Sequence, residues 1–327
     1  MNGVVIFAPS PVLTVTVEDH ADGSDVHVHA GGQGVWQARM LLALGTPVTL
    51  CSVLIGEAGR VLAHLAEDEG IRLVAVKAEG RGGTYVHDRR GGERAVIAES
   101  DGDALSRHDL DQLYGMTLRE GLDAESVILS ATRDDGIVPA DTYRRLASDL
   151  RANGTRVIVD LTGERLAAAL AGGVDVAKIS DEELLAEGRV TGDTTEELLA
   201  AMNKLRGQGA DAVVVTREER PVLLLTESGA TELTGPTLEV ADARGAGDSL
   251  TAGIASALGE GSSIEDAVTT GVAAGALNVT RHGLGTGDPD AIAALRERVQ
   301  ARPLGTAEKA ARVTPHDLAG MATEEPS

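Results

Sequence analysis

Residues 241–258 read ADARGAGDSLTAGIASAL and decide the fold of this 327-residue chain. Upstream of them, TLEV (237–240) has the composition of a short strand. Downstream, Leu250, Ile254 and Leu258 recur every four residues, which is the apolar spacing of one helix face. The segment therefore predicts a strand, a glycine turn and a helix in that order.

Asp248 stands where this helix begins, and two interpretations of it compete. As a structural residue, a carboxylate near the positive end of the helix dipole is favourable, and the glycines form an ordinary turn. As a functional residue, it follows Gly245, Ala246 and Gly247, whose backbone N–H groups can converge on a phosphate. The carboxylate would then accept a proton from an attacking hydroxyl. The local pattern leaves both interpretations open.

Composition excludes several classes of function. The formal net charge of −22 argues against a nucleic-acid or membrane-surface partner, because both need basic surface. No apolar stretch reaches the roughly 18 residues of a membrane span, and no signal pattern opens the chain, so we expect a cytoplasmic protein. Cys51 is the single cysteine, within the apolar run VTLCSVLIG, which predicts a buried strand position rather than a disulfide or metal ligand.

Apolar patterning alternates between strand and helix for most of the chain. Strand–helix alternation predicts an α/β fold with a mainly parallel sheet and helices on both faces. The early strands alternate polar and apolar residues and do not suit a buried sheet, so we expect residues 10–30 and 83–99 to form a small β-lid. We expect one domain over 1–302 and a tail over 303–327. The expected strands are 4–8, 12–18, 25–30, 48–54, 71–77, 83–88, 94–99, 126–130, 156–160, 175–179, 211–216 and 221–227, with helices that include 35–44, 57–69 and 262–279.

Several motifs are absent or incomplete. The chain has no Walker A loop and no GxSxG elbow, and Leu250 stands where a dinucleotide-binding motif needs its third glycine. His27 and His29 share one strand face without a third ligand nearby, which favours a solvated face over a metal site. Ser262 and Glu265 have the spacing of a helix capping box.

A second glycine cluster, AGGQGVWQARMLLALG (30–45), changes the interpretation. Together with RGAGDSLTAG (244–253), it resembles the paired signatures of the PfkB, or ribokinase-like, family of carbohydrate kinases, which have the forms GGKGxNxA and GAGD. The resemblance runs from about residue 3 to 302, and the order of segments is most similar to the branch of 1-phosphofructokinases and tagatose-6-phosphate kinases. It implies a ribokinase-like α/β fold with a β-lid.

The resemblance also implies roles for individual residues. Asp248 would be the base toward the acceptor hydroxyl, and Gly245, Ala246 and Gly247 would form the anion hole, with ATP and Mg²⁺ as cofactors. KISDEE (178–183) is similar to the family's KPNxxE segment, with Ser180 in place of asparagine. The residues implied for the nucleotide are Lys178, Ser180, Thr216 and Arg217; those implied for cations are Glu183, through water to Mg²⁺, and Asp242, near a monovalent ion for which K⁺ is the candidate.

The chain departs from the family pattern on both sides of the implied site. Gln33 replaces the GGKG lysine, Trp36 replaces an asparagine, and Val12 replaces a sugar-binding aspartate. Trp36 is either core filler or a stacking wall for a ring. The nucleotide turn TLGxxG is replaced by TREERP (216–221), which has no glycine. The implied substrate-binding residues are Gly31, Gly32, Gln33, Trp36, Arg39 and Arg133.

The leading hypothesis is ATP-dependent phosphorylation of a hydroxyl on a sugar, sugar phosphate or related small molecule. Two alternatives stay open: a nucleoside kinase, and a kinase-fold protein that binds a ligand without turnover. A small-molecule substrate is the expected partner, together with a second copy of the chain joined through the β-lid.

Overall fold

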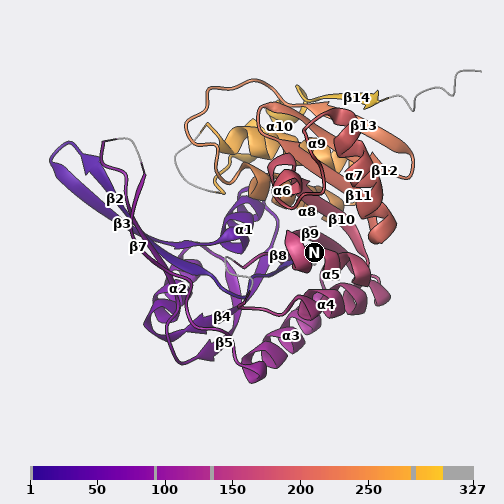
Figure 1. The fold of residues 1–327 in the computed structure, drawn as a ribbon. Coiled ribbons are helices and arrows are strands. Elements are labelled where there is room, and N and C mark those ends of the chain that lie inside the picture. The colour runs from indigo at the N-terminus through magenta and orange to yellow at the C-terminus, as the bar shows by residue number, and fades with distance from the viewer. Residues whose placement is uncertain (1–2, 92–93, 133–135, 281–284, 305–327) are drawn as a thin grey trace, which may run out of the picture.

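The computed structural model describes residues 3–91, 94–132, 136–280 and 285–304. A central sheet carries helices on both faces, and a second, smaller sheet projects from this body as a thin wing (Figure 1). Both the α/β architecture and the separate β-lid predicted from the sequence are confirmed.

The ten-stranded central sheet has the order β14-β13-β12-β11-β10-β9-β8-β1-β4-β5. The strands from β5 to β11 in this order run parallel, and β12, β13 and β14 continue the sheet antiparallel. The parallel strands are almost wholly apolar, as expected for strands that are covered on both faces. The ten strands of the sheet are β1 (Val4–Phe7), β4 (Val48–Ile55), β5 (Arg72–Ala78), β8 (Ser126–Ser130), β9 (Arg156–Asp160), β10 (Val174–Ser180), β11 (Ala210–Arg217), β12 (Arg220–Thr226), β13 (Gly229–Thr234) and β14 (Gln300–Leu304).

The lid is a four-stranded sheet of order β3-β2-β6-β7. One face of it turns toward the body, and the other carries the exposed valines Val26 and Val28. A bulge between Val86 and His87 shifts the register of β6 against β7. The strands are β2 (Val12–His20), β3 (Gly23–Gly31), β6 (Gly83–Asp88) and β7 (Ala95–Ser100).

Alternate residues of each central strand point into two separate cores. Val5 and Phe7 of β1 pack with one group of helices, whereas Val4 and Ile6 pack with the other. The first core is covered by α3 (Arg107–Leu122), α4 (Ala140–Ala152), α5 (Gly163–Gly172), α6 (Asp181–Ala186) and α7 (Thr195–Gln208). The second is covered by α1 (Gln33–Ala43), α2 (Gly56–Asp68), α8 (Ala246–Gly259), α9 (Ile264–Asn278) and α10 (Pro289–Arg296).

Glycines bring α8 close to α9 and thereby fix the start of α8. A Cβ on Gly253 would lie 2.8 Å from the Cα of Gly271, and one on Gly275 would lie 2.9 Å from the carbonyl oxygen of Ala246. Neither site leaves room for a side chain. The first turn of α8, which carries Asp248, is therefore held against α9 by backbone contact.

Two expectations about local structure were wrong. TLEV (237–240) is not a strand, because the sheet edge beside β13 is occupied by β14 and leaves no partner for it. Helix α9 is capped one residue later than expected, since the Ser263 hydroxyl, not that of Ser262, accepts the Asp266 N–H. Strand β14 spans Gln300–Leu304, and residues 305–327 of the expected tail lie outside the described ranges.

Candidate active site

The glycine turn and the first turn of α8 lie at the carboxyl ends of the parallel strands. Gly245 is the N-cap of α8 and has a left-handed φ of 76°, which favours glycine. The first bond of the helix runs from the Ser249 N–H to the Gly245 carbonyl, 2.9 Å. The N–H groups of Ala246 and Gly247 therefore have no acceptor within the helix and are free to bind an anion. Asp248 follows them, with only 9% of its surface exposed.

A buried lysine lies directly beside this turn. Lys178 Nζ is 3.1 Å from Asp160 Oδ1, and the Thr251 hydroxyl donates to Asp160 Oδ2 at 3.0 Å. A Cβ on Gly247 would lie 2.7 Å from Lys178 Nζ, which is closer than Cβ atoms come to other atoms. Glycine at this position lets the ammonium group reach the backbone of the anion hole.

Burial and charge set the proton affinities in this cluster. Burial raises the pKa of Asp248 well above its ordinary value, and the nearby Asp160 carboxylate raises it further. Burial lowers the pKa of Lys178, but the carboxylates of Asp160, Glu183 and Asp248 outweigh it, so the net direction is upward. Lys178 therefore stays charged, while Asp248 binds a proton more readily than an exposed aspartate and suits the role of a general base.

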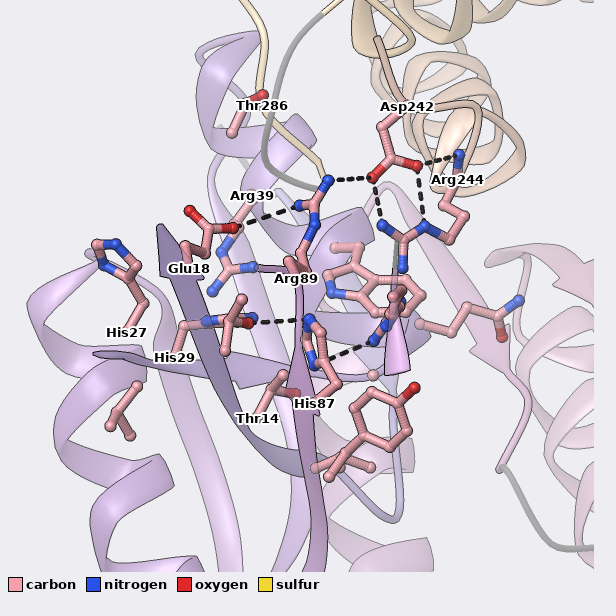
Figure 2. Close-up of a pocket in the computed structure, with 18 of the residues that line it drawn as sticks. Thr14, Glu18, His27, His29, Arg39, His87, Arg89, Asp242, Arg244 and Thr286 are labelled. Carbon is pink, nitrogen blue, oxygen red and sulfur yellow. Dashed lines mark hydrogen bonds and ion pairs between the residues drawn. The ribbon is translucent and has the colours of Figure 1, made fainter. Parts of the chain in front are cut away.

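A pocket of about 800 Å³ opens between the lid and the body, and Figure 2 shows the side chains around it. Its lining includes Val12, Gln33 and Trp36 but not Asp248, whose Oδ1 accepts a hydrogen bond from Gln37 Nε2 at 3.4 Å. The charged and titratable lining residues are Glu18, His27, His29, Arg39, His87, Arg89, Arg94, Asp242 and Arg244.

Both acids that line the pocket are paired with arginine. Asp242 binds the Arg244 guanidinium through both of its oxygens, one of them at 2.8 Å, and lies 3.9 Å from Arg89. Arg89 also contacts Glu18, at 3.5 Å. These contacts form one continuous chain from the lid to the loop that precedes the anion hole (Figure 2). The pocket therefore offers more positive than negative charge to a ligand.

His87 is held neutral in the wall of the lid. Its Nε2 lies 3.1 Å from the Thr16 hydroxyl, and Arg94 Nη2 lies 3.4 Å from its Nδ1. Burial and the charge of Arg94 lower the pKa of His87 to about 4. An arginine can only donate, so Nδ1 is the acceptor and Nε2 carries the proton. The pKa of His29 is also lowered, mainly by burial.

Some of the residues implied for substrate binding line the pocket. Gly32, Gln33, Trp36 and Arg39 line it, whereas Gly31 is buried just behind. Arg39 is already engaged, because it donates to both oxygens of Glu69 at 2.5 and 2.7 Å. Arg133 lies outside the described residues.

The residues implied for the nucleotide are less closely grouped. Lys178 belongs to the cluster beside Gly247, and Ser180 and Glu183 form a capping box at the start of α6. Thr216 pairs with Ser180 across β10 and β11. The buried Arg217 instead binds Glu232 at 2.9 Å and so stabilises the strands that follow.

Four residues of the site were missed in the sequence: Asp160, Thr251, Ser130 and Gln37. Asp160 could have been found, since it ends the buried strand RVIVD at the sheet edge where ligands bind in α/β folds. Thr251 lies one turn after Gly247 on α8. Gln37 and Ser130 carry no motif of their own, and only the fold brings them together with Asp248.

A mostly parallel central sheet with helices on both faces and a separate four-stranded lid is the ribokinase-like fold. The chain belongs to the PfkB family of carbohydrate kinases, because the family model described as "pfkB family carbohydrate kinase" matches residues 5–291. It is thus a kinase of the class that phosphorylates sugars or sugar phosphates with ATP.

Relatives and solved structures agree with this assignment. The chain is 29% identical over 257 residues to ATP-dependent 6-phosphofructokinase isozyme 2 of Escherichia coli, covering 77% of this chain and 82% of the relative. It is 26% identical over 294 residues to 1-phosphofructokinase of Bacillus subtilis, covering 86% and 93%. A crystal structure of E. coli phosphofructokinase-2 in complex with potassium matches with a TM-score of 0.80 and 25% identity over 91% of this chain and 99% of that one.

Proposed function

We propose that this kinase transfers the γ-phosphoryl group of ATP to a hydroxyl of a small anionic acceptor of the sugar-phosphate class, with Asp248 as the base. The observation that carries the proposal is the buried Asp248 at the N-terminus of α8, one residue from the glycine that admits Lys178. Both the base and the charge that a phosphoryl group requires thereby meet at one turn.

The residues support a division of labour in the transfer. Asp248 accepts the proton of the acceptor hydroxyl while the hydroxyl oxygen attacks the γ-phosphorus of ATP. The bond between that phosphorus and the leaving oxygen of ADP breaks. The N–H groups of Gly245, Ala246 and Gly247 bind the oxygens of the group in transfer. Lys178 neutralises part of their charge, while Asp160 and Thr251 hold the ammonium in place.

The residues implied for Mg²⁺ suit an ion held mainly by the ATP phosphates and by water. One oxygen of Glu183 is held by the Ser180 N–H at 2.8 Å, so Glu183 would reach a magnesium ion through water. Among the described residues, no group of three His, Cys, Asp or Glu side chains is placed to hold a metal ion, so the nucleotide's own phosphates would supply most of the metal's oxygen ligands. Bound Mg²⁺ would neutralise phosphate charge.

The residues do not fit a potassium ion at Asp242. Both of its oxygens already bind the Arg244 guanidinium, and Arg89 adds a second positive charge nearby. Arg244 therefore already supplies the positive charge that a potassium ion would bring to Asp242.

The pocket favours an anionic acceptor over a neutral polyol. Its four arginines outnumber its two acids, and both acids are paired. The hydroxyls of a neutral sugar would find few free carboxylates to accept their protons, whereas a phosphate would find several donors. Trp36 is half-buried and lines the pocket, which keeps a nucleoside acceptor as the second candidate. Binding without turnover finds no support in a site that keeps the base and the lysine together.

The test is ADP release with Mg-ATP against a panel of fructose 6-phosphate, fructose 1-phosphate, tagatose 6-phosphate, free sugars and nucleosides, with Asp248→Asn alongside. We expect turnover with a phosphorylated sugar and its loss in the variant. Activity with a neutral sugar or nucleoside alone would refute the anionic acceptor, and full activity of Asp248→Asn would refute the base.

A homodimer joined through the outer face of the lid is also part of the proposal. Val26 and Val28 on β3 are 56% and 45% exposed, and β3 is an edge strand of the lid. Val28→Glu should convert a dimer into a monomer in light scattering coupled to size exclusion. A wild-type monomer would refute the proposal.

Within the described ranges, no helix has the length and apolar character needed to cross a membrane.

A further inference from the structure

Two glutamines of α1 face the carboxylate of Asp248. Gln33 and Gln37 are four residues apart and so lie on the same side of the helix. Gln37 is completely buried, and its Nε2 donates to Asp248 Oδ1 at 3.4 Å. The nearby amide of Gln33 also lowers the pKa of that carboxyl against the effect of burial.

Each glutamine is anchored by its oxygen to the end of β8. Gln33 Oε1 accepts the backbone N–H of Ala131 at 2.6 Å, and Gln37 Oε1 accepts the hydroxyl of Ser130 at 2.6 Å. A backbone N–H can only donate, so the Gln33 amide has one possible orientation. The anchor at Ser130 leaves the NH₂ group of Gln37 for Asp248.

We propose an amide clamp in which Gln37, anchored by Ser130, is a positioning residue that orients Asp248 and stabilises its anionic form for proton transfer, while the Gln33 amide nearby favours the same anion. The inference rests on the proposed role of Asp248 as the base. Amide donors stabilise a carboxylate without neutralising it, so the oxygen keeps its ability to take a proton. The clamp opposes Asp160 and Glu183, whose charges act against the Asp248 anion, and works together with Lys178.

Gln37 is the better residue to test. Gln33 lines the pocket and would touch the acceptor, whereas Gln37 is not among the pocket residues. A change at Gln37 therefore reaches the reaction through Asp248. Gln37→Met keeps the length of the side chain and removes the donor, and Ser130→Ala removes the anchor but leaves the glutamine.

A direct readout is the ¹³C-carboxyl titration of Asp248 in aspartate-labelled protein, with the signal identified by its loss in Asp248→Asn. Losing a hydrogen bond to a charged group should raise the pKa of Asp248 by about one unit in Gln37→Met and by less in Ser130→Ala. Met40→Leu on the same helix and Ser52→Ala, another buried serine, are the matched controls and should leave the titration unchanged.

Kinetics supply the second readout. With the most active acceptor of the panel above, Gln37→Met should lower kcat roughly tenfold, with KM within about twofold of wild type. The acidic limb of its kcat/KM profile should move to higher pH together with the titration.

An unchanged titration of Asp248 in folded Gln37→Met would overturn the clamp; if that variant does not fold, an unchanged titration in Ser130→Ala would do so. The titration needs no turnover, so the two proposals can fail separately. Full activity of Asp248→Asn would remove the base, whereas an inactive Asp248→Asn with an unshifted Gln37→Met would remove only the clamp.

Discussion

Replacing Gly247 by alanine tests how closely Lys178 approaches the anion hole. The added Cβ would lie 2.7 Å from Lys178 Nζ and 3.3 Å from its Cε, whereas ordinary contacts begin near 3.4 Å. The ammonium must therefore retreat by roughly 0.7 Å. The ammonium group, which is now 3.1 Å from Asp160, would then lie further from the backbone N–H groups of the anion hole.

The expected result is a large loss of activity with little loss of stability. Displacing one charge that stabilises the transition state should lower kcat by about 10²–10³-fold. An off-rotamer lysine costs about 1 kcal/mol of unfolding free energy, and alanine in place of a helical glycine returns up to about 1 kcal/mol. The two nearly cancel, so the melting temperature should stay within a few degrees of wild type.

The assay is ADP release at saturating acceptor and Mg-ATP, with thermal unfolding followed by circular dichroism. Gly259→Ala, at the other end of α8, is the matched control, because its Cβ would make an ordinary 3.5 Å contact with Glu125. That variant should keep its activity. A folded Gly247→Ala that retains more than about a third of wild-type kcat would refute the argument that the ammonium must lie at this glycine.

Four further outcomes are expected. Cys51 should resist alkylation by iodoacetamide until the protein unfolds, because burial raises the pKa of its thiol to about 12; labelling of the native protein at pH 8 would contradict this. Arg39→Ala should lower the unfolding free energy by about 1–2 kcal/mol in denaturant titrations through its lost partner Glu69, and a raised KM with no change in stability would instead indicate a substrate contact. Replacing K⁺ by Na⁺ or tetramethylammonium should leave kcat within about twofold, since Arg244 already neutralises its neighbouring acid; strong potassium activation would show that reasoning to be wrong. The folded state raises the pKa of Asp248, so the contribution of this group to stability is present at low pH and is lost as pH rises through the folded pKa. Above that pH, Asp248→Asn should therefore melt at a higher temperature than wild type in calorimetry across a pH series. Equal melting curves there would argue against a raised pKa.

The parts of the fold that depend on local pattern could be predicted from the sequence. Strands β6, β8 and β9 begin and end at the predicted residues, because each is a short patterned run between turn signals. The strand expected at 237–240 was wrong for the opposite reason. Its alternation suits a strand, but β14 takes the sheet edge from more than sixty residues further along the chain.

The residues of the candidate site also fall into two groups: those that a continuous motif predicts and those that only the fold brings together. Asp248 and the glycines before it form one continuous motif, so their role could be predicted. Asp160 comes from a different strand and Gln37 from a helix near the start of the chain, and only the folded structure brings them near Asp248. For Arg39 the resemblance implied substrate binding, but in the folded structure this side chain forms an ion pair with Glu69, thirty positions away in the sequence.

The chain of charges between the lid and the body bears on how the lid opens. Arg89 belongs to the lid, whereas Asp242 and Arg244 belong to the body, and the acid is shared by both arginines. When the lid moves away, Asp242 keeps Arg244, and Arg89 keeps Glu18, which lies on the lid as well. Each charge would keep a partner, so opening would lose one ion pair, the long 3.9 Å contact between Arg89 and Asp242. The ion pairs between lid and body would therefore offer little resistance to lid movement, and a bound acceptor that contacts both parts would favour the closed arrangement.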